Sequence, residues 1–177
     1  MTEPHVIRTL GAADVAIYRE RMLEAYSREP DAFISTAEER AQEPESWWLQ
    51  RIADPAGLGA AFGAFVGDRL IGTTAVRFSE RQKVRHKATL LGVYVQERHR
   101  NDGLGRQLVS KALEAVRARP HVRVVTLTVT ESNEPALRLY EGVGFRRFGV
   151  EPMAIATPTG LASKVHMALE LSPTTPS

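Results

Sequence analysis

The sequence predicts an α/β fold in which helices flank a mixed central sheet of about six to seven strands. Three observations lead to this class. Apolar β-branched runs alternate with amphipathic runs, residues 88–130 follow the order strand, helix, strand, and a hairpin over residues 59–78 precedes them. A strand–helix–strand unit has parallel strands, whereas a hairpin is antiparallel, so the sheet must be mixed. Its apolar faces then need helices to cover them.

Periodicity and capping residues place the elements before the hairpin. Residues 5–10 form a short strand, and a helix follows over residues 12–27, where apolar side chains recur at helical spacing. Those side chains are Val15, Tyr18, Met22 and Tyr26. A helical region over residues 34–53 opens with a capping box at Thr36, and Pro44 breaks or restarts it. The hairpin itself turns at a Gly-Asp pair.

The second half continues the alternation of strands and helices. The long helix after the first central strand carries an apolar stripe at helical spacing, and the second central strand is rich in β-branched residues. In the last helix Asn133 is the expected N-cap, and Gly142 or Gly144 ends the helix. The expected elements are strands over 88–95, 122–130, 145–150 and 164–171, and helices over 103–120 and 133–145.

Composition bounds the function classes. The chain has 177 residues, 43% of them hydrophobic, which is typical of one globular domain. We expect a single domain over residues 1–171 and a frayed C-terminal tail over residues 172–177. A net charge of +2 argues against general nucleic-acid binding, and the absence of cysteine excludes disulfides, thiolate metal sites and cysteine-linked acyl intermediates. The five histidines show no metal-ligand spacing, so no metal is expected.

The sequence also bears on location. The N-terminus shows no basic segment followed by a long apolar run, and no apolar run approaches the length of a membrane span. We therefore expect a cytoplasmic protein with no membrane partner.

The segment from Val95 to Val116 places two glycines where a strand becomes a helix. The first turn of a helix has backbone N–H groups without internal partners and a partial positive charge, so it attracts anions. Glycine lets a phosphate approach the backbone closely. Arg98, Arg100 and Arg106 add positive charge nearby. The segment therefore predicts a site for a phosphate-bearing ligand.

Two familiar phosphate-binding motifs do not fit this segment. No Walker loop is present in the sequence. A dinucleotide fingerprint would need a third glycine where Leu108 stands. A loose variant over residues 57–63 continues into a strand, and a helix would be required there. A dinucleotide-binding module is therefore the less favoured interpretation, with Glu131 as the acidic residue that supports it.

The run Arg100, Asn101, Asp102, Gly103, Leu104, Gly105 resembles the acyl-CoA signature [QR]-x-x-G-x-[GA] of the GNAT superfamily of N-acetyltransferases. After the next strand, residues 133–145 resemble the second motif of the same superfamily, N-x-x-A-x-x-L-Y-x-x-x-G-F. The matching residues are Asn133, Ala136, Leu139, Tyr140, Gly144 and Phe145. The resemblance is specific from about Leu90 to Phe145 and rests elsewhere on the order of elements.

This resemblance implies a GNAT acyl-CoA N-acyltransferase fold and direct transfer of an acetyl group from acetyl-CoA to a primary amine. It implies that the backbone of Val93 and Val95 pairs with the pantetheine arm, that amides of residues 101–106 bind the pyrophosphate, and that Tyr140 protonates the departing thiolate. The implied cofactor contacts are Val93, Val95, Arg100, Asn101, Asp102, Gly103, Leu104, Gly105, Arg106, Asn133 and Tyr140.

The general base and the acceptor stay open. Many relatives carry a glutamate on a central strand, but residues 88–95 and 122–130 contain no carboxylate. The remaining candidates are Glu131, Glu39, Glu80, His86 and a water chain, and the base is unassigned. The acceptor is a small amine, an amino acid or a protein N-terminus, set by residues 27–48 and the loop over residues 156–163. A homodimer and a non-catalytic acyl-CoA sensor of the same fold are the other open alternatives.

Overall fold

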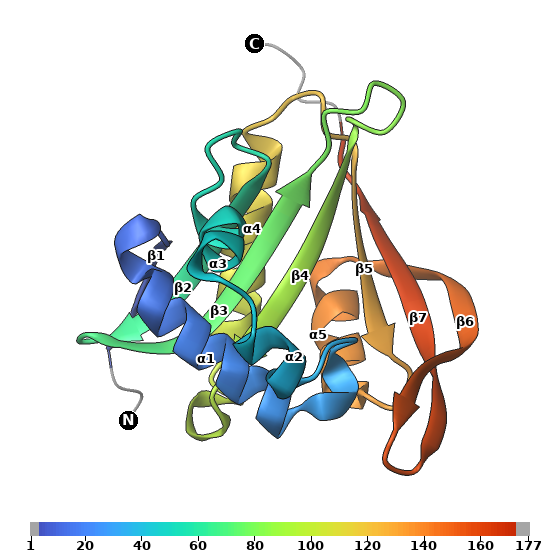
Figure 1. Cartoon of the computed structure of the whole chain (residues 1–177). Coiled ribbons are helices and arrows are strands. Elements are labelled where there is room, and N and C mark those ends of the chain that lie inside the picture. The colour runs from blue at the N-terminus through green and yellow to red at the C-terminus, as the bar shows by residue number, and fades with distance from the viewer. Residues whose placement is uncertain (1–3, 173–177) are drawn as a thin grey trace.

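A seven-stranded sheet in the order β1-β2-β3-β4-β5-β7-β6 runs through the computed structural model, which describes residues 4–172 (Figure 1). Its strands are β1 (Val6–Thr9), β2 (Gly59–Val66), β3 (Arg69–Phe78), β4 (Lys87–Val95), β5 (Val124–Thr130), β6 (Arg146–Thr157) and β7 (Gly160–Glu170). β4 and β5 are parallel, whereas the other neighbouring strands pair antiparallel. The predicted mixed α/β sheet is therefore confirmed.

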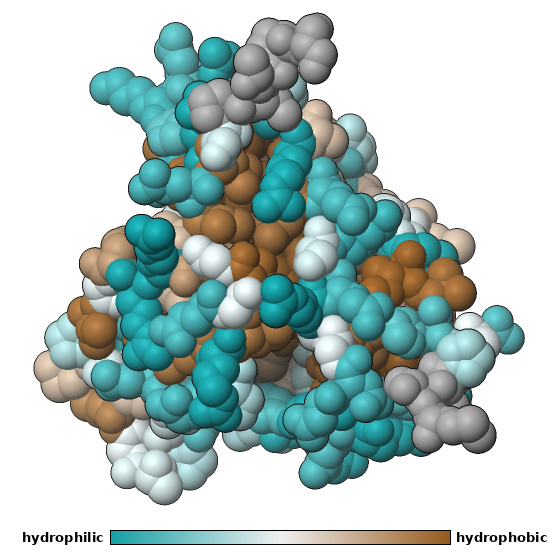
Figure 2. All heavy atoms as spheres, turned by 180° about the vertical axis from the view of Figure 1, so that it is seen from behind, coloured by the Kyte–Doolittle hydropathy of each residue, from teal (hydrophilic) through white to brown (hydrophobic). Residues whose placement is uncertain are grey.

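Helices cover both faces of this sheet (Figure 1). On one face lie α1 (Val15–Arg28), α2 (Ala37–Ala41) and α3 (Glu45–Ile52), and on the other lie α4 (Leu104–Arg117) and α5 (Glu134–Val143). Each layer of helices buries its own apolar cluster: Trp48 and Tyr18 lie on the first side, and Leu113 and Leu137 on the second. Seen from behind, hydrophilic side chains dominate the surface, and apolar atoms show between them (Figure 2).

The helix boundaries that were predicted from capping residues are confirmed. The Thr36 hydroxyl accepts from the Glu39 amide and the Glu39 carboxylate accepts from the Thr36 amide, so the capping box is complete. Pro44 is the N-cap of α3, so it restarts the helical region. Gly144, with a φ of +117°, ends α5. None of the helices over residues 4–172 is long and apolar enough to cross a membrane.

The last two strands are much longer than the sequence predicted, and the loop expected over residues 156–163 was wrong. β6 and β7 pair as a hairpin out to Thr157 and Gly160, so only a two-residue turn separates them. Two register shifts interrupt β6, and Met153, which lies within the second, adopts a φ of +51°. These irregularities and the exposed apolar residues of β6 break the alternation that marks a half-buried strand. The tail predicted over residues 172–177 lies, except for Ser172, outside the described residues.

The sheet splits between its two parallel strands. β4 and β5 pair only through Lys87–Thr89 and Val124–Thr126, although both strands continue well beyond. A register shift against β3 follows in β4, where Gly92 has a φ of +62°. Such a bulge bends the strand and increases its twist. β4 therefore diverges from β5, and its edge beyond Thr89 faces the gap (Figure 1).

Candidate functional site

A cavity of about 420 Å³ lies between the end of β4, the start of α4 and the start of α5; we call it the loop cavity. The predicted cofactor contacts line it, except Asp102. They come from segments that are far apart in the sequence: Val93 and Val95 from β4, residues 100–101 and 103–106 from the loop and α4, and Asn133 and Tyr140 from α5 and its cap. The structure thus brings the two sequence motifs together around one space.

The loop before α4 presents unpaired backbone N–H groups. The amides of residues 101–106 make no hydrogen bond with any residue in the described part of the chain, and the helical ladder starts with the Gln107 amide donating to the Gly103 carbonyl. Asn101 and Gly103 both adopt left-handed conformations, with φ of +70° and +76°. Successive N–H groups in such a turn form a concave anion site at the positive end of a helix. The Arg106 side chain lies beside it.

Arg100 ties this loop to the rest of the protein. Its Nε donates to the Val95 carbonyl at 2.8 Å, and its Nη2 donates to Glu29 Oε1 at 2.6 Å. The guanidinium also lies 5.7 Å from the centre of the Tyr94 ring. Its charge is therefore balanced by Glu29, at the C-cap of α1, and its main structural effect is to hold the loop against the end of β4.

Tyr140 stands at the junction between the loop cavity and a second cavity. Its ring is 8% exposed and packs edge-to-face on Phe145. Its hydroxyl makes no hydrogen bond with a described residue, and burial raises the pKa of that hydroxyl well above its ordinary value. The group therefore stays protonated at physiological pH and can donate a proton into the junction.

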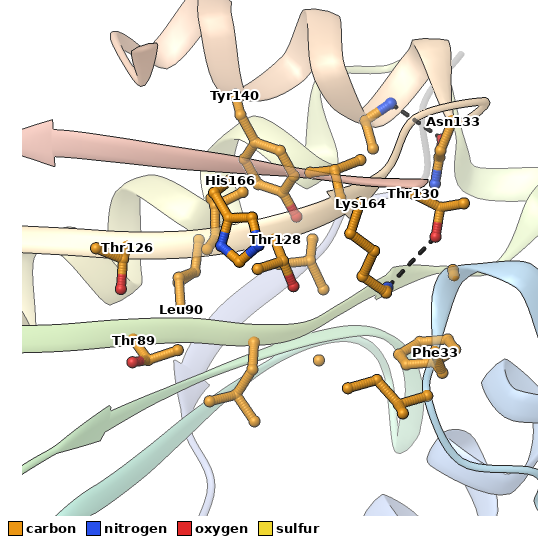
Figure 3. A pocket seen from close by; sticks show the side chains of 18 of the residues that line it. Phe33, Thr89, Leu90, Thr126, Thr128, Thr130, Asn133, Tyr140, Lys164 and His166 are labelled. Atoms are coloured by element: carbon orange, nitrogen blue, oxygen red, sulfur yellow. Dashed lines mark hydrogen bonds between the residues drawn. The ribbon is translucent and has the colours of Figure 1, made fainter. Parts of the chain in front are cut away.

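Asn133 serves the fold and lines both cavities. Its side-chain oxygen accepts from the Ala136 amide at 3.2 Å and caps α5, as predicted. The oxygen is held in this way, whereas the side-chain NH₂ group makes no hydrogen bond with a described residue (Figure 3). Capping and ligand contact are therefore compatible at this position.

The second cavity, also about 420 Å³, opens on the other side of Tyr140; we call it the strand cavity. Its polar wall is a patch of side chains from two neighbouring strands (Figure 3). In the β5–β7 register Thr128 stands opposite His166, and Thr130 stands opposite Lys164. These residues share one face of the sheet, while Val125, Leu127 and Val129 point into the core on the other face.

Two titratable side chains of this wall come from β7. Lys164 is 5% exposed and its Nζ donates to Thr130 Oγ1 at 3.3 Å (Figure 3). Burial lowers the pKa of the Lys164 ammonium. The His166 ring pairs with Glu151 through Nε2 at 3.1 Å and lies 5.9 Å from the Phe148 ring centre. Both side chains face the gap that the diverging strands leave.

The four candidates for the general base do not meet at either cavity. Among the described residues, the lining of the strand cavity contains no aspartate or glutamate. Glu39 is exposed and engaged in the capping box of α2, and the other three candidates are exposed as well. Those three are Glu80, His86 and Glu131. None of the four lines either cavity, and the identity of the base stays a prediction.

Lys164, His166 and the threonines of β5 are candidate site residues that the sequence did not indicate. A signal was present: polar residues alternate with apolar ones in both segments, at 126, 128 and 130 and at 164 and 166. Alternation predicts a solvated face, however, and does not say that these two strands are neighbours in the sheet. That information comes from the pairing of β5 with β7, which joins residues about 35 positions apart.

Comparison with known proteins points to the family that the two sequence motifs resemble. The model of the Acetyltransferase (GNAT) family matches residues 19–145. A mycothiol acetyltransferase of Thermomonospora curvata is 36% identical over 138 residues, which cover 76% of this chain and 41% of that protein. An L-amino acid N-acetyltransferase of Escherichia coli is 26% identical over 66% of this chain and 70% of its own length. A ribosomal protein bS18-alanine N-acetyltransferase of the same species is 32% identical over 54% of this chain and 64% of its length.

Solved structures agree on the fold. A putative acetyltransferase from Salmonella typhimurium, solved with its cofactor acetyl-CoA, superposes with a TM-score of 0.78 at 19% identity and covers 98% of both chains. A GNAT acetyltransferase from Streptococcus pneumoniae gives a TM-score of 0.79 at 22% identity, over 95% of this chain and all of the other. These likenesses concern the course of the backbone.

Proposed function

Because the chain belongs to the acetyltransferase (GNAT) family, we propose that it is an N-acetyltransferase that transfers the acetyl group of acetyl-CoA directly to a primary amine. The observation that carries this proposal is the row of unpaired amides at residues 101–106, beside a cavity that leads past Tyr140 into a second cavity. One cavity suits the donor, the other suits the acceptor, and Tyr140 lies where they meet.

The residues of the loop cavity fit the parts of acetyl-CoA. The unpaired amides and the positive start of α4 suit the pyrophosphate. The edge of β4 beyond Thr89 is not paired with β5, so its backbone groups can bind the amides of the pantetheine arm as an added strand would. The Val95 carbonyl already accepts one hydrogen bond from Arg100, so it keeps one lone pair for such a contact.

The bound donor would supply an activated thioester. Side chains of the protein would then donate a proton to the departing sulfur and accept one from the attacking amine. We assign Tyr140 as the acid that protonates the departing sulfur, because its buried hydroxyl stays protonated and faces the junction. For the base we propose His166, directly or through water, since it lines the strand cavity and Glu151 holds its ring. A neutral imidazole in this position can take the proton of the attacking amine.

Acetyl-CoA binding tests the donor half of this proposal. Acetyl-CoA should raise the melting temperature of the protein, whereas NAD should not. Gly103→Glu should remove the shift because it places bulk and negative charge at the anion site and forces a left-handed backbone on a non-glycine residue. An unchanged melting curve at millimolar acetyl-CoA would contradict the proposal. Release of free thiol in the presence of a panel of amines tests the transfer.

A non-catalytic acyl-CoA sensor of the same fold is the second candidate. The observation that favours it is the lack of a carboxylate among the described residues that line the strand cavity. A sensor would bind acetyl-CoA as tightly as an enzyme. Turnover of any amine above the uncatalysed rate would exclude it.

A further inference from the structure

The strand cavity has an imbalance of charge. Arg40, Arg51, Lys87 and Lys164 contribute to its lining, and the described lining residues include no aspartate or glutamate. Arg40 is balanced by Glu43, which lies 3.2 Å away just outside the lining. Lys164 is the cation that is deeply buried in this wall. The hydrogen bonds and ion pairs of its ammonium therefore determine which charge a bound molecule should carry.

The hydrogen bonds around Lys164 leave two of its donors unused. An ammonium has three N–H groups, and Lys164 donates to Thr130 Oγ1 alone among the described residues. Thr130 donates its own proton to the Asp31 carbonyl, so its oxygen is fixed as an acceptor and orients Lys164. The carboxylate of Glu151, the cross-strand neighbour of Lys164, is hydrogen-bonded to His166. Thr130 thus orients Lys164, but among the described residues no carboxylate forms an ion pair with its ammonium.

An oriented, buried and unpaired ammonium is unusual. Taking a charge out of water is costly unless an opposite charge or several hydrogen bonds compensate for it, so buried cations in proteins are normally paired. Nothing in the core requires a cation at this place, because the apolar residues of β5 and β7 face the opposite side of the sheet. Glu151 attracts Lys164 from beyond ion-pair distance and is engaged with His166, so an opposite charge in contact with Lys164 is expected from a bound molecule.

Resting on the proposed transfer to an amine, we propose that the acceptor is a small amine that also carries a carboxylate, such as an α-amino acid, and that Lys164 binds this carboxylate. Lys164 and His166 are alternate residues on one face of β7, so their backbones lie roughly 7 Å apart. The carboxylate would lie at Lys164 while the amine, one or two bonds further on, points toward His166 and the junction at Tyr140. Thr128 supplies a further hydroxyl on the same wall.

This geometry separates the proposed acceptor from other amines. A simple alkylamine or polyamine would bring more positive charge to a wall that already carries Lys164. The N-terminus of a peptide would place a neutral amide where the carboxylate is expected, and would leave the ammonium unpaired. A cavity of about 420 Å³ is also the size of a small-molecule site.

The test compares each acid with its own amide. Initial rates of thiol release are measured for a panel of L-amino acids, the corresponding amino acid amides and two short peptides at saturating acetyl-CoA. The wild-type protein should use the best acid with a kcat/KM about 10- to 100-fold above that of its amide, the range expected for a charge-assisted hydrogen bond. The amide has the less basic amine, so basicity alone would favour the amide.

Lys164→Met should remove this preference by raising KM for the acid while leaving the values for the amide within about twofold. Lys83→Met makes the same chemical change at an exposed residue outside both cavities and should leave the preference intact. A melting shift with acetyl-CoA in both variants verifies that they fold and bind the donor.

Three results would overturn the inference. Equal or better use of amides or peptides by the wild-type protein would show that no carboxylate is recognised. A Lys164→Met variant that loses kcat equally for acids and amides would make Lys164 a proton acceptor. A panel in which acetyl-CoA shifts the melting temperature but no acid is acetylated would reject the acceptor class and leave the donor half of the proposed function standing. The absence of any acetyl-CoA shift would instead reject the proposed function, and the inference with it.

Discussion

Tyr140 is the residue on which the proposed chemistry depends most directly. If its hydroxyl protonates the thiolate, Tyr140→Phe should lower kcat by about 10²–10⁴ while acetyl-CoA affinity changes little, because the ring and its packing on Phe145 remain. The raised pKa of Tyr140 adds a pH signature: the acid form is present below that pKa, so its deprotonation should cause no loss of rate up to pH of about 10. Steady-state rates and isothermal titration check both statements. Normal turnover in the variant would restrict Tyr140 to a packing role.

Lys164 carries a prediction about stability that is independent of turnover. Burial lowers its pKa in the folded protein, so the unfolded chain binds more protons between that lowered value and the ordinary value of 10.5. The cost of burying the charge is fully present below the folded pKa and fades as pH rises through this window. Lys164→Met should therefore be more stable than the wild type at pH 7, and the difference should shrink toward pH 10.5. Urea unfolding at several pH values measures it, with Lys83→Met as the control. A difference that does not change with pH would contradict the burial of a charged Lys164.

At the scale of single residues, the sequence predicted residues that line the loop cavity but not the polar wall of the strand cavity. Gly103, Asn133 and Tyr140 stand in motifs whose spacing along the chain is fixed, so the order of residues alone was enough to suggest their roles. Lys164 acquires its surroundings from Thr130 and Glu151, which lie in two other strands. Such neighbours depend on strand order and register, and no local pattern encodes them.

The start of α4 carries the proposed donor site, and its two glycines are required for different reasons. Gly103 has a φ of +76° with open space where a Cβ would lie, so its requirement is conformational. Gly105 lies within the helix, and a Cβ there would meet Leu139 Cδ2 at 3.4 Å, an ordinary contact. Gly103→Ala should cost about 1–2 kcal/mol of unfolding free energy and weaken acetyl-CoA binding.

Gly105→Ala is the matched comparison for this helix start. Alanine is favoured over glycine within a helix by roughly 0.5–1 kcal/mol, which offsets the contact with Leu139. The variant should therefore keep its stability, and the acyl-CoA signature tolerates alanine at this position. Chemical denaturation with and without acetyl-CoA separates the two effects. A larger loss of stability for Gly105→Ala than for Gly103→Ala would refute this account of the turn.

The success of element prediction follows the strength of local signals. The capping box at Thr36, Pro44 at α3 and Asn133 at α5 are short-range features, and each marked an element boundary correctly. β6 has no comparable signal, because it is bulged and carries exposed apolar side chains such as Phe148 and Met153. Its length is set by pairing with β7, so a long hairpin took the place of the short strands and loop that the sequence suggested.

At the scale of the whole molecule, the two cavities adjoin where β4 diverges from β5. Both cavities are lined by Phe33, Val93, Asn133 and Tyr140, whereas the start of α4 lines the loop cavity alone and Lys164 and His166 line the strand cavity alone. In the proposed function, a donor in the loop cavity and an acceptor in the strand cavity can therefore be bound at the same time. Neither has to leave before the other enters.

This arrangement predicts sequential kinetics. Acetyl-CoA and the amine should form a ternary complex with the enzyme, so double-reciprocal plots at several fixed amine concentrations should intersect. The chain has no cysteine to carry the acetyl group, which agrees with direct attack of the amine on the thioester. Parallel lines, together with a mass increase of one acetyl group on the protein in the absence of amine, would contradict the direct mechanism. In that case the acyl carrier should be sought among the nucleophiles of the strand cavity, whose lining includes Lys164 and His166.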